Sequence, residues 1–501
     1  MSSWLKVSKP EFAFGSLFEF ETESAFAEIL ILPLLNYNCN FQKIQFWFSL
    51  MAKIEKYLYN FFMENFEQFG IQIPEILLPR KKELNTWCVV ACDQYTQDFD
   101  YWKKTEEIVG SSPSTLNLIL PEIFLSSSDK KERIEKIRQT MKKYLDENIF
   151  DLPEKEFIYV ERKTCYGRVR RGLVAAIDLE TYEWKPFSKS LIRATEATIP
   201  ERIPVRKEIR KDAPLELPHI MLLVNDSEHC LIEEAGSEAR KNPPVYDGNL
   251  MMNGGHVSGW AVKSKEAFEK ISSALEKLKR ENSDGEGNSF LFAVGDGNHS
   301  LATAKAVWDE CKNSDSSDLN ARYALVEIVN IYDSGLTFEP IHRVLFNCDA
   351  FKLISFLNEK LDGELVEETN ENALEKNVKS SKADFGFVFK ENESQKYFRL
   401  KTKIQELAVS RLQLLLDEFI SCNKEIEIDY IHGNEEVFRL GAQKNAVAIL
   451  LPPIAKDSFF ETISSRGPLP RKSFSMGEAS EKRFYLECRK LFSADRLSVN
   501  P

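Results

Sequence analysis

One segment of the sequence constrains the fold more than any other: a continuous apolar run that passes directly into a helical pattern. Residues 290–294 read Phe-Leu-Phe-Ala-Val, residues 295–300 read Gly-Asp-Gly-Asn-His-Ser, and a helix is expected from there to about Glu310. A short, continuous apolar run is typical of a strand buried on both faces, as in α/β folds. The sequence therefore predicts a strand–turn–helix unit at these residues.

The turn of this unit carries side chains suited to phosphoryl chemistry. The first N–H groups of a helix have no internal partner and can bind a phosphate, and the two glycines let the backbone approach it closely. Asp296 can hold Mg²⁺ or accept a hydroxyl proton, and His299 can donate to a phosphoryl oxygen. The structural alternative is a glycine turn in which Asn298 or Ser300 caps the helix.

Two further segments are rich in groups that bind anions, and a third carries a polar pair. Residues 193–206 contain three arginines, two threonines and two prolines, and residues 470–477 form a basic, hydroxyl-rich loop. Arginine suits bidentate binding of phosphate or carboxylate. Asp93 and Gln94 follow a short apolar run and form a possible site pair. Solvated surface loops are the alternative for each of these segments.

Helical and strand patterns alternate along the rest of the chain, which predicts an α/β fold. The expected strands cover residues 87–92, 157–161, 173–179, 323–330 and 446–451. The expected helices cover residues 129–148, 263–280, 404–421 and 481–491.

The length of 501 residues implies two or three packed domains. We expect an α/β part at residues 63–285 that holds the arginine-rich loop, and another at 286–501 that holds the strand–turn–helix unit and the loop 470–477. Residues 1–62 contain ten of the 35 phenylalanines and little periodicity. They are either an extra surface-packed or membrane-touching segment or the product of a mis-called start before Met63.

Charge and cysteine usage exclude several classes of protein. With 66 basic and 78 acidic residues the net charge is −12, which argues against a nucleic-acid partner. Nine cysteines without a Cys-x-x-Cys spacing indicate a reducing compartment, and the cytoplasm is the expected location. No apolar run reaches the roughly 18 residues of a membrane span, so no membrane partner is expected.

Seven segments, in their order along the chain, resemble a bacterial and archaeal family known as the domain of unknown function number one thousand and fifteen. The resemblance runs from about Ile71 to Leu491. The segments are residues 87–94, 114–117, 171–174, 193–206, 295–300, 339–343 and 472–477.

The resemblance implies a ParB/sulfiredoxin-like α/β core with a mixed sheet and additional α/β domains. The segment Asp296-Gly-Asn-His-Ser300 is similar to the Asp-Gly-x-His-Arg of ParB-like free serine kinases, and some relatives are thought to use pyrophosphate as the donor. The implied activity is phosphoryl transfer from pyrophosphate, ADP or ATP to free L-serine, giving O-phosphoserine, or the reverse reaction. Ser300 replaces the arginine, so another cation has to supply the missing charge.

These considerations give a set of expected site residues. Asp296, His299 and Glu196 are the expected catalytic groups, with Mg²⁺ at Asp296. The expected phosphate- and substrate-binding residues are Gly295, Gly297, Asn298, Ser300, Arg193, Thr195, Arg202, Arg206, Lys472, Ser473 and Ser475. A nucleotide- or phosphate-binding regulatory module and a phosphoserine hydrolase are the alternative functions, and the sequence leaves the oligomeric state open.

Overall fold

The computed structural model describes residues 66–313, 319–392 and 394–492. The chain divides into residues 1–62 and residues 63–501, and all the described residues belong to the second unit. The extra segment expected at residues 1–62 lies outside the described residues.

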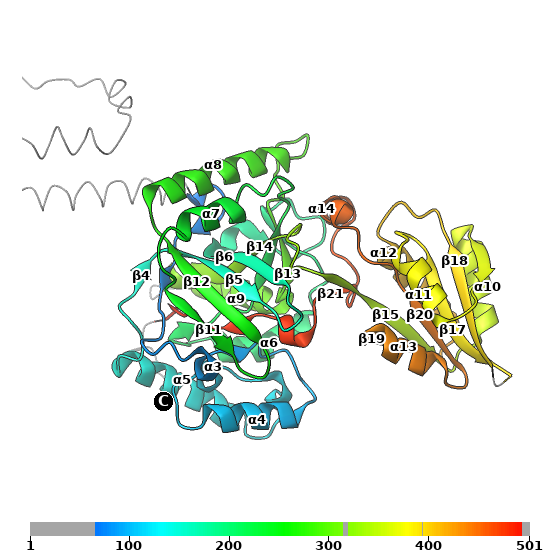
Figure 1. Cartoon of the computed structure of the whole chain (residues 1–501), viewed down its shortest axis with the longest axis horizontal. Helices are drawn as coiled ribbons and strands as arrows, with labels where there is room; N and C mark the ends of the chain where they lie inside the picture. Colours follow the sequence, from blue (N-terminus) through cyan, green and yellow to red (C-terminus); the bar gives the residue numbers. More distant parts are fainter. Residues whose placement is uncertain (1–65, 314–318, 393, 493–501) are drawn as a thin grey trace, which may run out of the picture. The chain divides into compact units, whose positions relative to one another are not determined.

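A ten-stranded mixed sheet forms the centre of the first α/β part (Figure 1). Its strands, in spatial order, are β11 (Tyr246–Leu250), β12 (Gly255–Val262), β5 (Phe157–Lys163), β6 (Val169–Asp178), β14 (Tyr323–Asn330), β10 (Met221–Val224), β13 (Phe292–Asp296), β8 (Ile192–Ala194) and β7 (Tyr182–Glu183), and β1 (Ile71–Gln72) pairs with β6. The pairs β10–β14, β13–β8 and β7–β8 are parallel, and the other pairs are antiparallel. All eight residues of β14 are buried, as expected for a strand covered on both faces.

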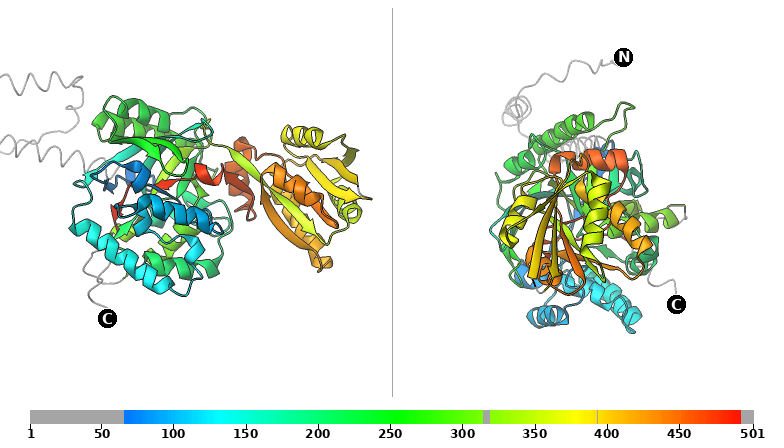
Figure 2. Two further views of the ribbon diagram at one scale, coloured as in Figure 1. Left: turned by 60° about the horizontal axis from the view of Figure 1, so that its bottom comes forward. Right: turned by 90° about the vertical axis from the view of Figure 1, so that its right-hand side faces the viewer.

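Helices pack around this sheet in separate groups. Helix α7 (Ile232–Ala239) lies against α8 (Lys265–Glu281), whose residues Phe268, Ile271, Leu275 and Leu278 form its buried stripe. Helix α6 (Ile203–Arg210) lies against α9 (Asn298–Cys311). Helices α3 (Leu84–Trp87), α4 (Phe99–Val109) and α5 (Lys130–Asp146) complete this part (Figure 2).

A second, seven-stranded sheet is antiparallel throughout. Its spatial order is β16 (Glu364–Glu367), β18 (Ser394–Lys401), β17 (Phe385–Glu391), β20 (Ala446–Leu450), β15 (Phe338–Phe346) and β19 (Glu427–His432), and β21 (Phe474–Met476) pairs with the start of β15. Strand β17 alternates between two cores: Phe385, Phe387 and Phe389 belong to one, and Val388 belongs to the other. This period of two places helices on both faces of the sheet.

The two helical layers of the second part are built from different elements. Helices α10 (Ala350–Leu361) and α12 (Ala408–Cys422) contribute apolar residues to the core that contains Phe387, and α14 (Phe459–Arg466) joins them. Helices α11 (Glu371–Lys379) and α13 (Asn434–Gly441) contribute to the core that contains Val388. The mixed α/β fold with a mixed sheet and an additional α/β part, predicted from the sequence, is therefore confirmed.

The chain returns to the first part after β21, and here one predicted helix is wrong. A 3₁₀ turn (Ala479–Glu481) ends at the first residue of the segment 481–491. Two short strands follow, β22 (Phe484–Tyr485) and β23 (Arg489–Lys490), which pair with β3 (Val89–Val90) and β9 (Leu215–Glu216). Every residue from 481 to 489 is buried. An amphipathic helix would keep an exposed face, so pairing with distant strands determines the structure of this segment.

The predicted division at residue 285 does not separate two sheets. The ten-stranded sheet takes β10 from one side of this position and β13 and β14 from the other. The seven-stranded sheet is formed between residues 338 and 476. The second α/β part is thus an insertion between β14 and the returning segment 484–490.

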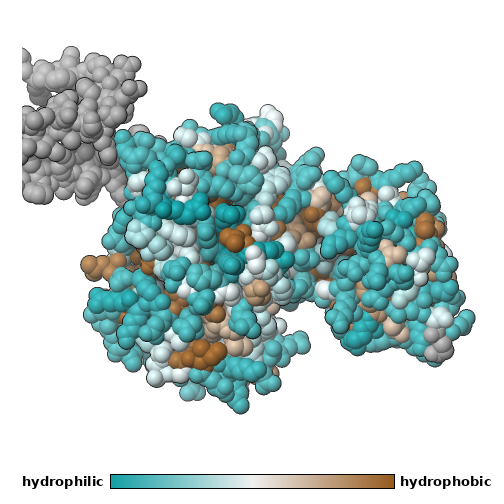
Figure 3. Space-filling model, in the orientation of Figure 1, coloured by the Kyte–Doolittle hydropathy of each residue, from teal (hydrophilic) through white to brown (hydrophobic). Residues whose placement is uncertain are grey.

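The remaining predicted elements agree with the structure to within a few residues. The strand predicted at 87–92 shortens to β3, because Trp87 ends helix α3. On the face shown in Figure 3, hydrophobic residues occur in small groups among hydrophilic ones. Across the three described ranges, no helix has both the length and the apolar character that a membrane span requires.

Candidate functional site

The structure confirms the predicted strand–turn–helix unit, and close contacts explain why both turn positions, 295 and 297, are glycine. Strand β13 ends at Asp296, and Gly297 precedes α9 with a φ of 81°, in the left-handed region that favours glycine. A Cβ atom on Gly297 would lie 3.1 Å from the Cα of Ile220, and one on Gly295 would lie 2.8 Å from Met476 Sδ. The backbone can follow this path only because both positions lack a side chain.

Asp296 lies between the turn and the returning C-terminal segment. One carboxylate oxygen accepts a hydrogen bond from the N–H of Gly297 at 3.0 Å, and the other is 3.2 Å from the ammonium of Lys482. Lys482 is only 7% exposed, so its charge is largely removed from water. The ion pair therefore places a cation directly beside the predicted catalytic carboxylate.

The arginine-rich loop is tied to the same turn through Thr195 and Asn298. Because β8 pairs in parallel with β13, the two strands end together. The Thr195 N–H donates to Asn298 Oδ1 at 3.1 Å, and Asn298 Nδ2 donates to Thr195 Oγ1 at 3.3 Å. Gly297 is the N-cap of α9 without a side-chain cap bond, so Asn298 holds the loop rather than capping the helix.

Glu196 follows directly and meets Asp296 and the loop 470–477. Its carboxylate accepts a hydrogen bond from the N–H of Ser473 at 3.4 Å. Burial raises the pKa of Glu196 to about 7, and the negative charge of Asp296 adds to this, while Lys472 and Arg471 oppose it. A carboxyl group with this pKa exchanges a proton readily near neutral pH, as a general base requires.

His299 occupies the first turn of α9 as a neutral imidazole. Burial, together with the nearby charges of Arg206, Arg202 and Arg471, lowers its pKa to about 4. Its Nε2 accepts a hydrogen bond from the N–H of Ile199 at 3.3 Å. The ring proton is therefore assigned to Nδ1, which can donate to a ligand.

The structure brings some of the predicted cations to this site and directs one of them elsewhere. Arg206 donates to Glu122 and, at 3.3 Å, to the C=O of Arg202. Arg193 is buried: its guanidinium lies 4.4 Å from the centre of the Phe290 ring and donates to Ser464 Oγ at 3.2 Å. Arg193 therefore supports the packing of α14 and does not face the turn that contains Asp296.

The loop 470–477 is held by its own hydroxyl groups and by a buried arginine. Ser473 Oγ donates to the C=O of Pro470 at 2.5 Å, and Ser475 Oγ donates to the C=O of Gly477 at 2.8 Å. The fully buried Arg343 donates to the C=O of Lys472 at 3.0 Å. The predicted hydroxyl ligands are thus engaged within the loop, while the exposed side chain of Lys472 is free of such bonds among the described residues.

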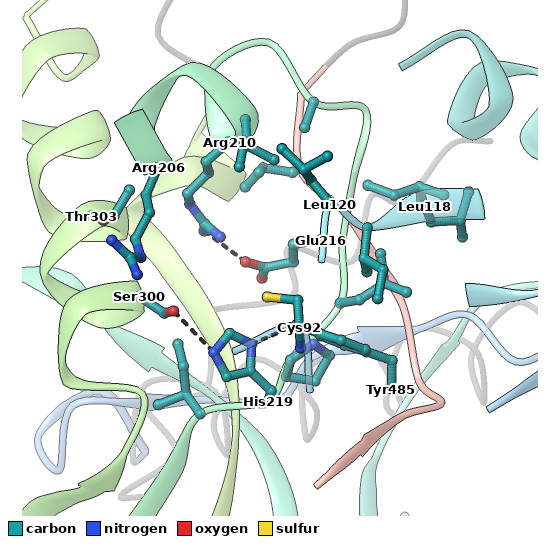
Figure 4. Close-up of a pocket in the computed structure, with 18 of the residues that line it drawn as sticks. Cys92, Leu118, Leu120, Arg206, Arg210, Glu216, His219, Ser300, Thr303 and Tyr485 are labelled. Atoms are coloured by element: carbon teal, nitrogen blue, oxygen red, sulfur yellow. Dashed lines mark hydrogen bonds and ion pairs between the residues drawn. The ribbon is translucent and has the colours of Figure 1, made fainter. Parts of the chain in front are cut away.

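A mainly apolar cavity of about 150 Å³ adjoins this cluster (Figure 4). Leucine side chains, among them Leu118 and Leu120, form one wall, and Arg206 and Ser300 line the opposite side. Ser300 Oγ is 3.0 Å from His219 Nε2, and His219 Nδ1 is 2.9 Å from the hydroxyl of Tyr485. Ser300 thus lines one cavity together with Arg206 and with Arg210, whose guanidinium is bound to Glu216 at 2.6 Å.

Asp93, from the predicted polar pair, lies in the same neighbourhood. Burial alone would raise the pKa of Asp93, but His219, the hydrogen bond from Gln94 and the charge of Lys482 together lower it. The sequence pattern does not place Lys482 among the site residues, because it predicts a helix for the segment 481–491. It also did not single out His219, which lies outside every segment selected for its composition, or Arg471, which lies within the loop 470–477.

The side chains around Asp296 offer few ligands for Mg²⁺, which prefers several oxygen donors. Within the described part of the chain, no group of three or more His, Cys, Asp or Glu side chains could hold a metal ion. Asp296, the predicted ligand, already accepts from a backbone N–H and pairs with Lys482. These residues do not fit a metal site built by the protein alone, and Lys482 supplies the positive charge at that carboxylate.

Comparison with known proteins identifies a family model and several solved structures. The model described as "Protein of unknown function (DUF1015)" matches residues 75–418. No curated protein matches the chain. A free serine kinase in complex with AMP is similar in structure at 13% identity and a TM-score of 0.33, with 64% of this chain and 92% of that chain covered.

Two further solved structures are similar at comparable levels. A conserved hypothetical protein from Pyrococcus furiosus has 13% identity and a TM-score of 0.31, with 62% of this chain and 90% of that chain covered. SbnI with a C-terminal truncation, from Staphylococcus aureus, has 8% identity and a TM-score of 0.31, with 61% and 82% covered.

Proposed function

The chain belongs to the family described as Protein of unknown function (DUF1015), and we propose that this member transfers a phosphoryl group from a nucleotide to free L-serine. The observation that carries the proposal is the geometry before α9: Asp296 lies 3.2 Å from the ammonium of Lys482 and accepts from the N–H of Gly297 at 3.0 Å, and Glu196 interacts with the same carboxylate. Burial raises the pKa of Glu196 to about 7, which suits a general base. The acceptor follows from the resemblance of residues 296–300 to the motif of free serine kinases.

The charges of the site suit a phosphoryl donor. Phosphoryl transfer is catalysed mainly by positioning and by neutralisation of the charge on the phosphoryl oxygens. Arg202, Arg206 and Arg471 lie near enough to His299 to lower its pKa, and Lys482 pairs with Asp296. The free N–H groups of the first turn of the 14-residue helix α9 add partial positive charge.

Glu196 is the proposed general base. It takes the proton of the serine hydroxyl while the hydroxyl oxygen forms its bond to phosphorus and the bond from phosphorus to the leaving phosphate oxygen breaks. The leaving group is AMP when ADP is the donor and ADP when ATP is the donor. Neutral His299 donates from Nδ1 to a phosphoryl oxygen, and Asp296 orients Lys482 and the acceptor.

The cavity beside α9 favours a nucleotide over pyrophosphate as the donor. Pyrophosphate has no base or ribose, so a site for it needs cations and little apolar surface. The leucine-lined cavity shares Arg206 with the cation cluster and can take a planar, mostly apolar base. We therefore expect ADP or ATP to be the better donor.

Phosphorus NMR of the full chain with L-serine and Mg²⁺, in separate tubes with ADP, ATP or pyrophosphate, tests the proposal. A phosphoserine signal with a nucleotide is the expected result. Asp296→Asn should abolish it in a protein that circular dichroism shows to be folded, although the loss of the partner of buried Lys482 lowers its Tm. Asp100→Asn, at an exposed position in α4, should leave the signal intact. Absence of phosphoserine in all tubes would refute the proposal, and release of phosphate from phosphoserine without an acceptor would favour a hydrolase.

A further inference from the structure

A second cavity lies against the seven-stranded sheet and has no part in the proposed phosphoryl transfer. Its volume is about 590 Å³, which is within the range of small-molecule sites. The start of β15, the end of β19, α11 and residues 451–456 form its walls. Glu339 and His342, from the segment 339–343 that carries part of the family resemblance, both line it.

Two buried polar atoms of this cavity lack a partner. Thr337 Oγ1 and His432 Nε2 make no hydrogen bond to any of the residues that the structure describes, although both atoms are buried. Buried polar groups in native proteins are nearly always paired, so two such atoms in one cavity indicate a place for a water molecule or a ligand. Both residues line the cavity, so one ligand can reach both.

Unpaired charges of opposite sign line the same cavity. Among residues 66–313, 319–392 and 394–492, the carboxylate of Glu339 and the ammonium of Lys379 take part in no hydrogen bond or ion pair. The cation near Glu339 is Arg168, but its guanidinium is bound to Glu481 through two hydrogen bonds of 3.1 and 2.5 Å. Glu339 and Lys379 therefore both remain available to a ligand.

A relay of hydrogen bonds stiffens one wall. The N–H of Leu451 donates to His342 Nδ1 at 3.0 Å, so the ring proton is on Nε2, which donates to Asn434 Oδ1 at 2.7 Å. Asn434 Nδ2 in turn donates to Glu375 at 2.7 Å. Burial lowers the pKa of His342 to about 4, so the imidazole is neutral near neutral pH. The donor and the acceptor in each of these hydrogen bonds therefore stay the same at that pH.

The lining also includes the apolar residues Phe338, Val378, Leu450 and Ile454. Two further charged residues of the lining already have partners: Lys456 donates to the C=O of Leu336 at 2.9 Å, and Glu478 lies 3.4 Å from His432 Nδ1. A ligand that suits the whole cavity has a positive group, a negative group and an apolar portion. We propose that the cavity binds a free α-amino acid with an apolar side chain, whose ammonium pairs with Glu339 and whose carboxylate pairs with Lys379. This site is independent of Glu196 and Asp296, and it stands whether or not the protein transfers a phosphoryl group.

Isothermal titration calorimetry of the full chain tests this site. The probes are L-leucine, L-methionine and L-phenylalanine, together with two analogues of leucine that lack one charge, isopentylamine and 4-methylpentanoate. At least one amino acid is expected to bind with one site per chain. Each analogue should bind at least about tenfold more weakly than leucine, because each loses one charge-assisted contact. No binding of any amino acid, or equal binding of an analogue, would overturn the proposal.

Matched variants assign the binding to this cavity. Glu339→Gln and Lys379→Met should each weaken binding by at least about tenfold. Glu359→Gln on α10 and Lys376→Met on α11, both at exposed positions outside the cavity, should bind as the unaltered chain does. Lys379 is exposed, so its variant keeps the test decisive even if the Glu339 variant does not fold. Asp296→Asn should bind the amino acid normally, which separates this site from the proposed phosphoryl-transfer site.

Discussion

Replacing Glu196 by glutamine should stabilise the protein at alkaline pH while it removes the proposed general base. Glutamine has nearly the same shape and can still accept the hydrogen bond from the N–H of Ser473, so the main change is the loss of a titratable charge. Raising a carboxyl pKa from 4.5 to about 7 corresponds to about 3 kcal/mol against the ionised form. Glu196 is partly exposed, and screening by solvent reduces this to about 2 kcal/mol.

The sign of the effect follows from proton binding in the two states. Below pH 4.5 the carboxyl group is protonated in both the folded and the unfolded chain, so it contributes no difference. Between pH 4.5 and about 7 the unfolded chain loses its proton first, so the folded protein binds more protons and becomes less stable as the pH rises. Above about pH 7 the full cost of the buried charge is present.

Urea unfolding followed by circular dichroism measures this difference. The free energy of unfolding of Glu196→Gln should exceed that of the unaltered chain by about 2 kcal/mol at about pH 8, and by less than half of that at about pH 5.5. Glu201→Gln, at an exposed position in the same loop, should show no such dependence on pH. An equal difference at both pH values, or a less stable Glu196→Gln protein at about pH 8, would refute the reasoning.

Three other substitutions probe separate features of the site. Lys482→Met should lower kcat by about 10²-fold or more in the phosphorus NMR assay, because the cation beside Asp296 is lost, whereas Lys490→Met at an exposed position should not. Gly295→Ala should lower the free energy of unfolding by about 1–3 kcal/mol, because the added Cβ would lie 2.8 Å from Leu223 Cγ; an unchanged Tm would contradict this close packing. Arg193→Met should lower Tm but leave the KM for the donor unchanged, because the Arg193 guanidinium packs on Phe290. A raised KM would show instead that Arg193 contacts the donor.

Much of the local structure follows from local pattern. The continuous apolar run before residue 295 predicts β13, and the repeat of apolar residues at helical spacing predicts α5 and α8. The helix predicted at residues 481–491 is wrong because contacts with distant segments determine the structure there. There the chain pairs with β3 and β9, which lie far away in the sequence, and a window of neighbouring residues has no information about such partners.

Some features of the candidate site likewise follow from local sequence, and others depend on tertiary contacts. The sequence alone pointed to the residues of the turn, Asp296 and His299, and to Glu196 in the arginine-rich loop, because glycine spacing and residue type are local properties. Only the tertiary structure brings Lys482 to Asp296 and directs Arg193 away to Phe290. It also buries Glu196 near Asp296, and burial first, with the charge of Asp296 second, raises its pKa to about 7. Charge interactions depend on the distance between the groups and on their burial. For these residues both are set by the packing of segments that lie far apart in the sequence.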